Sequence, residues 1–216
     1  MRRTDDLEGR AIEGLRERKR ADNRSATIDI GFALFTERGY DNVTVADICA
    51  AAEIGRRTFF RYFASKEALL GEPVQHMLDQ VLAHVDAAAP DLDDGQVLRA
   101  AISEVAGYAL THRAQLELHN QVVTTATSLK ASPFRQLPEH EHLIVQRLVA
   151  RRGPGATPDW RTQLVVARVV SALRVWLNET FKTPEGTDTR PLLDEIFDTD
   201  SWLSTAATRT GLDRGR

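Results

Sequence analysis

Residues 44–67, TVADICAAAEIGRRTFFRYFASKE, decide how the rest of the chain is interpreted. Thr44 and Asp47 have the spacing of a capping box, which predicts that a short helix begins here. Residues 53–55 predict a tight turn, and a second short helix is expected over about residues 56–62. Two short helices joined by a tight turn and packed on a longer one form a helix-turn-helix, so this stretch predicts that motif.

The second short helix divides into two faces when its residues are placed about 100° apart. One face is expected to anchor the helix in a small core through three aromatic residues, Phe59, Phe60 and Phe63. The opposite face presents two guanidiniums, a hydroxyl and a phenol, from Arg57, Thr58, Arg61 and Tyr62.

Two cations stand in the first turn of this helix, at Arg56 and Arg57. Exposed cations there oppose the helix dipole, each at a cost of about 0.3–1 kcal/mol. No acidic residue lies between Glu53 and Glu67 to offset them. DNA would supply the missing negative charge through its phosphates, and arginine can also donate two hydrogen bonds to guanine. The alternative is that the two arginines form a solvated face.

The charge of the chain is unevenly divided. Residues 1–66 hold 13 Lys and Arg against 11 Asp and Glu, whereas residues 67–216 hold 15 against 20. The formal net charge of −3 excludes a uniformly basic coat but leaves room for a local basic patch. The slightly basic N-terminal third is therefore expected to meet an anionic partner.

Membrane and secretory classes are not indicated. The longest stretch without a charge, residues 118–129, is too short for a membrane span of about 20 residues. No signal peptide is visible at the start, and the single cysteine, Cys49, makes no intrachain disulfide. We therefore expect a cytoplasmic protein without membrane attachment, in which Cys49 is an inert core thiol.

Helical periodicity dominates the chain and predicts an all-α fold of about nine helices. A first long helix is expected from about Arg18 to Arg38, with Gly39 as its left-handed C-terminal cap. The other helices are expected at about residues 65–87, 96–112, 115–130, 135–151, 159–182 and 191–206, besides the two short ones. The domain organisation expected from this pattern is a flexible arm (1–17), a three-helix DNA-binding domain (18–65), a helical body (66–206) and a flexible tail (207–216).

Two segments resemble the signature of the TetR family, the tetracycline-repressor-like transcription regulators. Residues 35–48, FTERGYDNVTVADI, resemble the end of the family's first helix and the start of its second. Residues 51–70, AAEIGRRTFFRYFASKEALL, resemble the remainder. The glycine, the capping threonine, Thr58, the aromatic run and the Lys66–Glu67 pair all have the expected spacing, and the similarity covers about residues 20–70.

The resemblance implies a homodimer that places two recognition helices in the major grooves of a roughly palindromic operator on double-stranded DNA. Carried over by position, Arg56, Arg57 and Thr58 would contact bases or phosphates, with Arg61 on the same face. Tyr62 would contact a base or the backbone, while Thr44 and Lys66 would contact phosphates. Phe60 departs from the family, which most often has Tyr there. Because phenylalanine cannot donate to a phosphate, its role stays open between the core and a thymine methyl.

Basic residues near the N-terminus offer a further contact. Five cations could reach a minor groove or phosphates: Arg16, Arg18, Lys19, Arg20 and Arg24. The acidic residues among them favour ordinary solvation instead.

The body is expected to bind an effector and to dimerise, as in the family. Residues 160–181 are apolar around the whole helix, so this helix must bury more than one face. Helices 159–182 and 191–206 would then form a four-helix bundle with their twofold mates, and the alternative is a helix central to a monomer. Four residues are candidates for lining an effector pocket: Tyr108, His119, Phe134 and Trp176. Each could equally be an ordinary core or surface residue. A pocket with such an aromatic and aliphatic lining favours an apolar or amphipathic small molecule.

The mechanism that the resemblance implies is repression relieved by this effector. Without the effector, the dimer occludes a promoter, with its recognition helices about 34–36 Å apart. The effector fills the body and moves the fourth helix, which changes that spacing. Activation instead of repression stays open.

Two other classes of protein are less well supported. No cofactor or metal is expected, because the six histidines lack metal-ligand spacing and no nucleotide, phosphate-loop or hydrolase motif occurs. The Glu-x-x-His at residues 139–142 is single, whereas a di-iron bundle needs two, so an enzyme is not expected. The remaining alternative is a helical dimeric module that binds ligands or proteins but not DNA.

Overall fold

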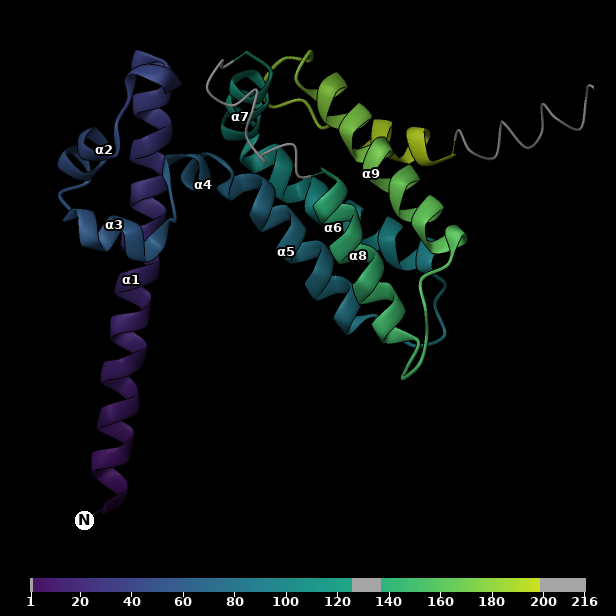
Figure 1. Ribbon diagram of the computed structural model, residues 1–216, viewed down its shortest axis with the longest axis horizontal. Helices are drawn as coiled ribbons and strands as arrows, with labels where there is room; N and C mark the ends of the chain where they lie inside the picture. The colour runs from purple at the N-terminus through teal and green to yellow at the C-terminus, as the bar shows by residue number, and fades with distance from the viewer. Residues whose placement is uncertain (1, 126–136, 199–216) are drawn as a thin grey trace, which may run out of the picture. The chain divides into compact units, whose positions relative to one another are not determined.

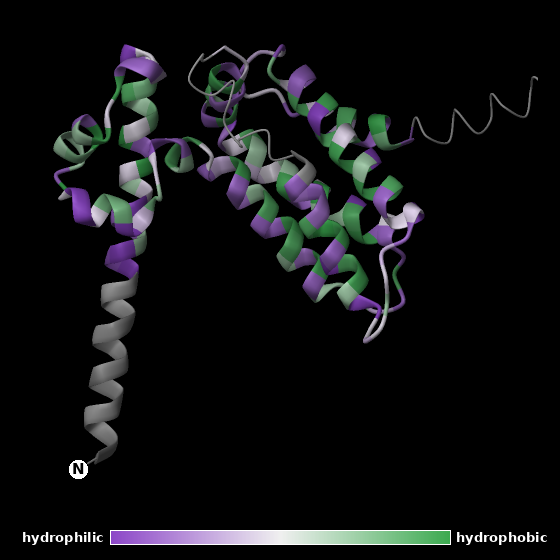
Figure 2. Cartoon of the chain, viewed as in Figure 1, coloured by the Kyte–Doolittle hydropathy of each residue, from purple (hydrophilic) through white to green (hydrophobic). Residues whose placement is uncertain are grey.

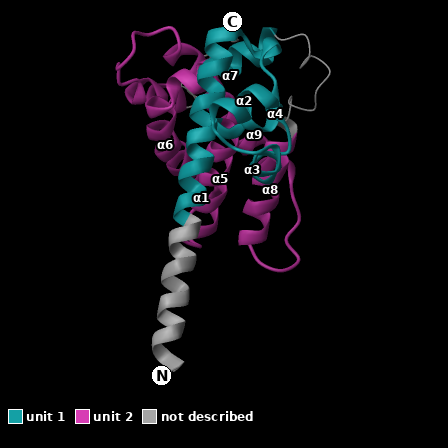
Figure 3. Cartoon of the chain, turned by 90° about the vertical axis from the view of Figure 1, so that its left-hand side faces the viewer, with its two compact units in different colours: residues 1–73, 118–134 teal, residues 74–117, 135–216 magenta. Residues whose placement is uncertain are grey.

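The computed structural model describes residues 2–125 and 137–198, and every regular element within them is a helix (Figure 1). The all-α fold class is thereby confirmed. The chain forms two compact units, residues 1–73 with 118–134 and residues 74–117 with 135–216 (Figure 3). The domain boundary expected between residues 65 and 66 therefore falls inside the first unit.

The first helix, α1, spans Arg2–Arg38, so it begins at Arg2 and not near Arg18 as expected. Residues 2–17 contain four Arg and three Glu, whose high helix propensity continues the helix through a segment with little amphipathic pattern. At the other end, Gly39 has a φ of +79° and its amide donates to the carbonyl of Phe35 at 3.0 Å. The predicted glycine end of α1 is confirmed in its positive φ, but the ψ of Gly39, 142°, lies outside the left-handed helical region, so the cap is not the left-handed one that was expected.

The first unit packs short elements around an aromatic core. The 3₁₀ turn η1 (Tyr40–Asn42) and helix α2 (Val45–Ala51) lie against α1, and α3 (Arg56–Tyr62) lies against α2. The buried aromatic residues are Phe32, Phe35, Tyr40, Phe59 and Phe63. Their rings meet mostly edge to face or tilted, as between Phe35 and Tyr40, whose centroids are 5.0 Å apart. This core fixes the helix-turn-helix that the capping pattern predicted.

The single long helix expected over residues 65–87 is instead two helices, α4 (Lys66–Leu70) and α5 (Glu72–Ala87). The break falls at Gly71. The physical reason is Pro73, which has no amide to donate to the carbonyl of Leu69 and whose ring would clash with that carbonyl. The helix therefore ends before the proline and restarts with Pro73 in the first turn of α5, where its missing donor costs nothing.

The second unit is built from long helices around an aliphatic core. It contains α5, α6 (Asp94–Thr111), α8 (Leu137–Arg151), α9 (Trp160–Thr180) and the helical residues 190–198. Apart from the start of α5, these helices were predicted to within a few residues, although residues 199–206 of the last predicted helix lie outside the described part. Hydrophobic residues run along α5, α6 and α8 in this unit (Figure 2).

One helix, α7 (Arg113–Thr125), belongs to both units. Leu116 is buried in the core of the second unit, and Val122 is buried in the aromatic core of the first. Its predicted extent was 115–130, of which residues 126–130 are outside the described part. A continuous helix thus contributes to two separate cores.

Candidate nucleic-acid interface

The helix α3 is anchored by two aromatic side chains. Phe59 and Phe63 are 0% and 2% exposed, and their ring centroids lie 5.3 Å apart. The helix begins at Gly55, whose carbonyl accepts hydrogen bonds from the amides of Thr58 and Phe59 at 2.8 and 3.1 Å. No side chain caps this start, because Gly55 has none. The predicted anchoring face is confirmed for Phe59 and Phe63.

Phe60 does not belong to that anchoring face, and the expectation that three aromatics enter the core is wrong at this position. Its side chain is 52% exposed. At about 100° per residue, Phe60 lies roughly 80° away from the direction midway between Phe59 and Phe63. A helix of two turns contacts its core along a narrow strip, and Phe60 falls outside the strip.

The outward face of α3 is cationic. Arg56, Arg57 and Arg61 are exposed, and Thr58 and Tyr62 are half-buried. The first turn contains no acidic residue, and the Arg61 guanidinium lies 5.2 Å from the centroid of the Tyr62 ring. Figure 2 shows the hydrophilic start of α3 followed by hydrophobic residues. Three guanidiniums are therefore available to an anionic partner on one seven-residue helix.

Thr44 forms the N-cap of α2 as predicted. Its Oγ1 accepts a hydrogen bond from the Asp47 amide at 3.2 Å, and the Asp47 carboxylate accepts one from the Thr44 amide at 2.8 Å. The hydrogen bonds from Thr44 hold the pKa of Asp47 below its ordinary value. Thr44 is itself exposed, so the capping box leaves it at the surface of the first unit.

Lys66 has a structural role that the sequence did not indicate. Its ammonium donates to the carbonyls of Tyr40 and Val43 at 2.9 and 2.8 Å, and it lies 4.0 Å from the centroid of the Tyr40 ring. Burial lowers the pKa of Lys66. Two of its three N–H donors thus fasten the turn around η1 to the start of α4. A phosphate contact would have to use the third.

The same turn is held a second time by Tyr40, whose hydroxyl donates to Oε1 of Glu67 at 3.1 Å. Burial, together with the neighbouring Glu67 carboxylate, raises the pKa of Tyr40 well above its ordinary value. Tyr40 and Glu67 are 27 positions apart. No local pattern in the sequence could have paired them.

The N-terminal cations divide into two groups. Arg24 forms an ion pair with Glu72 and lies 5.2 Å from the centroid of the Phe63 ring, so it is held within the first unit. Arg18, Lys19 and Arg20 are exposed on α1. The side chain of Arg16 lies outside the described residues. A DNA contact from this end of α1 stays a prediction for Arg18, Lys19 and Arg20.

The four predicted pocket residues have different environments. Trp176 is 0% exposed and its Nε1 donates to the carbonyl of Thr189 at 2.7 Å, so it is a core residue of the second unit. Tyr108 is half-buried between the rings of His76 and His112, at centroid distances of 4.4 and 4.0 Å. His119 is half-buried on α7. Phe134 lies outside the described residues.

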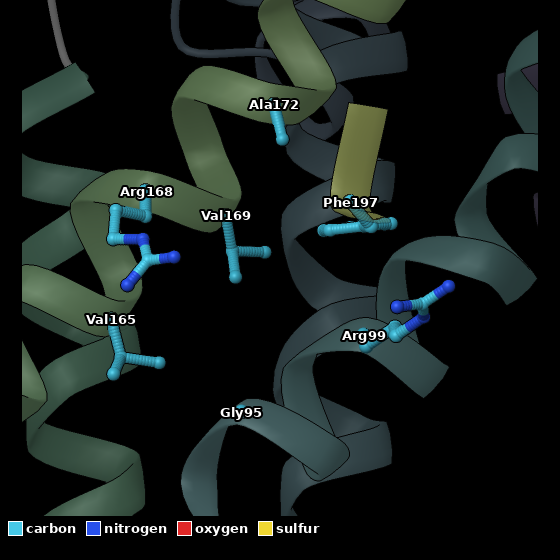
Figure 4. A pocket seen from close by; sticks show the side chains of 7 residues that line it. All are labelled: Gly95, Arg99, Val165, Arg168, Val169, Ala172 and Phe197. Atoms are coloured by element: carbon cyan, nitrogen blue, oxygen red, sulfur yellow. The ribbon is translucent and has the colours of Figure 1, made fainter. Parts of the chain in front are cut away.

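A groove of the second unit involves none of these four residues (Figure 4). It encloses about 190 Å³ and is lined by Gly95, Arg99, Val165, Arg168, Val169, Ala172 and Phe197. Arg99 and Arg168 project from different helices, α6 and α9, and Arg99 is engaged with Asp198 at 2.9 Å. Ligand sites usually measure about 300–1,000 Å³, so this groove is small for an apolar effector.

Other kinds of site are not found in the part of the chain that the structure describes. Among those residues no three His, Cys, Asp or Glu side chains are grouped as metal ligands would be, and no helix has both the length and the apolar character to cross a membrane. Cys49 is buried, and burial raises the pKa of its thiol, which makes it less reactive.

Comparisons with known proteins agree with this geometry. Residues 28–72 match the family model described as bacterial regulatory proteins, tetR family. The HTH-type transcriptional regulator TcmR of Streptomyces glaucescens is 31% identical over 179 residues, which cover 76% of each chain. The HTH-type transcriptional repressor DhaR of Mycobacterium sp. (strain GP1) is 34% identical over 68 residues, covering 32% of this chain and 34% of DhaR.

Solved structures share the fold. A transcriptional regulator of the "TerR/AcrR family" from Aquifex aeolicus VF5 has a TM-score of 0.55 at 12% identity, covering 84% of this chain and 99% of that one. The segment that matches the family model runs from α1 to the start of α5 and contains Thr44, all of α3 and Lys66, whereas Arg18, Lys19 and Arg20 precede it.

Proposed function

This chain belongs to the TetR family of bacterial transcriptional regulators, and on that premise we propose that α3 is the recognition helix with which it reads operator DNA. The chain is a DNA-binding regulator of transcription and not an enzyme. One observation carries the assignment of α3. This helix buries Phe59 and Phe63 on one side and exposes three guanidiniums on the other, with no carboxylate anywhere along it.

The exposed cations fit the chemistry of a major groove. Arginine can donate two hydrogen bonds to O6 and N7 of guanine, which discriminates against other bases by about 1–3 kcal/mol. We assign base contacts to Arg56, Arg57 and Arg61, with Thr58 and Tyr62 beside them. Thr44 and the third donor of Lys66 would contact phosphates, which fix the position of the helix without reading sequence.

A homodimer would present this helix twice to a palindromic operator. The face of α9 that contains Val166, Val169 and Trp176 is buried in its own unit. On the opposite side, Trp160 and Leu164 are 63% and 49% exposed, as is Val175 at 45%. These three fall within about 60° of one another around the helix, and such an exposed apolar stripe suits a twofold partner.

The dimer has a direct test. Leu164→Glu combined with Val175→Glu should convert the protein to a monomer in sedimentation equilibrium, because it would place four carboxylates in one apolar interface. The matched variant Leu143→Glu changes an exposed leucine on α8 and should remain dimeric. A wild-type protein that sediments as a monomer would remove the dimer from the proposal.

Repression relieved by a small molecule is the regulatory outcome that we propose. DhaR, one of the relatives, is named a repressor. The body would bind an apolar or amphipathic effector, and Tyr108 and His119 remain candidates for contacting it. Since α7 contributes to both cores, a change in the body could pass along it, as well as through the junction of α4 and α5, to the recognition helix. A protein that acts on chromosomal DNA in this way would work in the bacterial cytoplasm.

The test of DNA recognition begins with selection of bound fragments from genomic DNA, followed by fluorescence anisotropy with the selected operator. Arg57→Ala should weaken binding by about 1–3 kcal/mol, roughly 5- to 150-fold, and relax the preference at one base step. The control is Arg190→Ala, which removes the same charge from an exposed position of the second unit and should bind as the wild type does.

Substitution of Lys66 distinguishes a phosphate contact from a contact that reads a base. Lys66→Ala should lower affinity about equally for all sequences and reduce the slope of log K against log salt by about one unit. It should also lower the melting temperature, because the carbonyls of Tyr40 and Val43 lose their donor. If Arg57→Ala and Lys66→Ala both bind operator with wild-type affinity and salt dependence, the assigned interface is wrong.

A further inference from the structure

Phe60 is the unusual residue of the recognition helix. It is 52% exposed, and every other exposed large apolar side chain among residues 18–125 and 139–198 lies in the second unit. Stability of the first unit gains little from such a position, since half of the ring remains in water. A partner outside the chain would bury the exposed half of the ring.

Its position places the ring among the DNA-contacting cations. Around the axis of α3, Phe60 lies about 40° from Arg56 and about 60° from Arg57, so it shares their outward face. The ring is also held in place from below. It meets the buried ring of Phe59 edge to face, with centroids 5.5 Å apart and an interplanar angle of 88°. A contact made by Phe60 would thus have a fixed position on the helix.

The chemistry of the phenyl ring narrows the choice of partner. It has no polar group for a phosphate oxygen or for the donors and acceptors of base edges. The major groove offers one apolar group, the C5 methyl of thymine. The flanking guanidiniums would bring this face of α3 close to the bases, where the ring and a methyl group could exclude water from each other.

We propose that Phe60 is a specificity residue that reads a thymine in each operator half-site by packing its ring against the C5 methyl group. This inference rests on the proposed function of α3. It adds a preference for T·A next to the guanines that the arginines favour. The contact would also bury the surface of the ring that is exposed in the free protein.

Replacement of single thymines by deoxyuridine tests the contact, because only the methyl group is removed and base pairing is kept. In the selected operator, the substitution should weaken wild-type binding at one symmetric pair of positions, by about fourfold per half-site, the value of one buried methyl group. All other thymines should tolerate it. Phe60→Ala should bind the thymine and deoxyuridine operators equally well, with its fold verified by its melting temperature.

The matched control is Leu143→Ala, which truncates an exposed apolar side chain of the second unit and should keep the full discrimination. Wild-type protein that binds the operator tightly but senses no deoxyuridine overturns this inference and leaves the proposed function intact. The same holds if Phe60→Ala discriminates as strongly as the wild type. Protein that binds no duplex at all overturns the proposed function, and this inference with it.

Discussion

The two units of this chain are stabilised in different ways. The first unit is held by aromatic rings, such as Phe35 against Tyr40, and its short helices begin at local caps, Thr44 for α2 and Ser65 for α4. The second unit has an aliphatic core between long helices. The two units thus differ in the chemistry of their cores, aromatic in the first and largely aliphatic in the second, whereas both depend on contacts between distant segments, such as those of Lys66 in the first.

Arg113 shows how the second unit makes such distant contacts. It is 9% exposed and stands at the start of α7. Its guanidinium donates to the carbonyls of Phe181, Thr183 and Pro184 at 3.0, 2.7 and 3.2 Å. These carbonyls follow the end of α9, so one side chain holds a segment about 70 positions away along the sequence.

The largest effects should come from removing one anchor from each core. Phe59→Ala and Trp176→Ala should each destabilise the protein by about 3–5 kcal/mol, the usual cost of emptying a buried aromatic position. If the two cores are separate, hydrogen exchange should accelerate mainly in α2 and α3 for Phe59→Ala. For Trp176→Ala it should accelerate mainly in α8 and α9. Acceleration throughout the chain in both variants would show that the units unfold together.

The next largest effect is expected for Arg113→Met. Loss of hydrogen bonds from a charged donor, with carbonyls left unpaired, should lower the free energy of unfolding by about 1.5–3 kcal/mol. Denaturant titration measures it, and hydrogen exchange should be fastest at residues 181–184. Arg190→Met, at an exposed ion pair with Asp188, should change stability by less than about 0.5 kcal/mol. Equal effects of the two variants on the free energy of unfolding would contradict the structural role assigned to Arg113.

Alanine substitution of two helical glycines, one in each unit, should change the free energy of unfolding by smaller amounts and in opposite directions. A Cβ on Gly31 in α1 would lie 2.7 Å from a methyl group of Leu69, which is fully buried, whereas a Cβ on Gly107 in α6 would have nothing within 4 Å. Gly31→Ala should therefore destabilise by about 1–3 kcal/mol. Gly107→Ala should stabilise by about 0.5–1 kcal/mol through helix propensity. Thermal unfolding of both variants checks the difference in sign, and stabilisation by Gly31→Ala would refute the close contact of α1 with α4.

The smallest expected effects are changes in how the melting temperature depends on pH. Hydrogen bonds hold the pKa of Asp47 and of Asp159 below the ordinary value, through Thr44 in the first unit and Thr162 in the second. The stabilisation from each is complete above about pH 3.9 and is lost as the pH falls below that value toward the lowered pKa. Asp47→Asn and Asp159→Asn should each flatten the acid-induced decrease in melting temperature below about pH 4. An unchanged acid profile in both variants would contradict these caps.

Much of the first unit was predictable from short-range patterns. The capping box at Thr44, the glycine end of α1 at Gly39 and the burial of Phe59 and Phe63 each depend on residues at most four positions apart. The resemblance to a family then supplied the function. The second unit was predictable only as a set of helices, because nothing local assigns Trp176 to a core and not to a pocket wall.

The differences between the predictions and the structure also have physical causes. The break between α4 and α5 could have been predicted, since Pro73 alone forces it, but the amphipathic pattern continues across the break and conceals it. Phe60 was expected in the core because its type is apolar, and only the narrow contact strip of a two-turn helix left it outside. The phosphate contact of Lys66 stays a prediction, but no local pattern indicated that two of its donors reach carbonyls more than twenty positions away.

Local patterns in the sequence were enough to predict most of the helices, the cationic face of α3 and the resemblance to the family. These properties follow from hydrogen bonds and side-chain spacing within one or two helical turns. The tertiary structure alone decided that Phe60 is exposed, that Lys66 fastens a turn, that Arg113 holds the end of α9 and that α7 serves two cores. Each of these depends on how separate helices pack, and packing is set by the joint burial of residues that no local pattern connects.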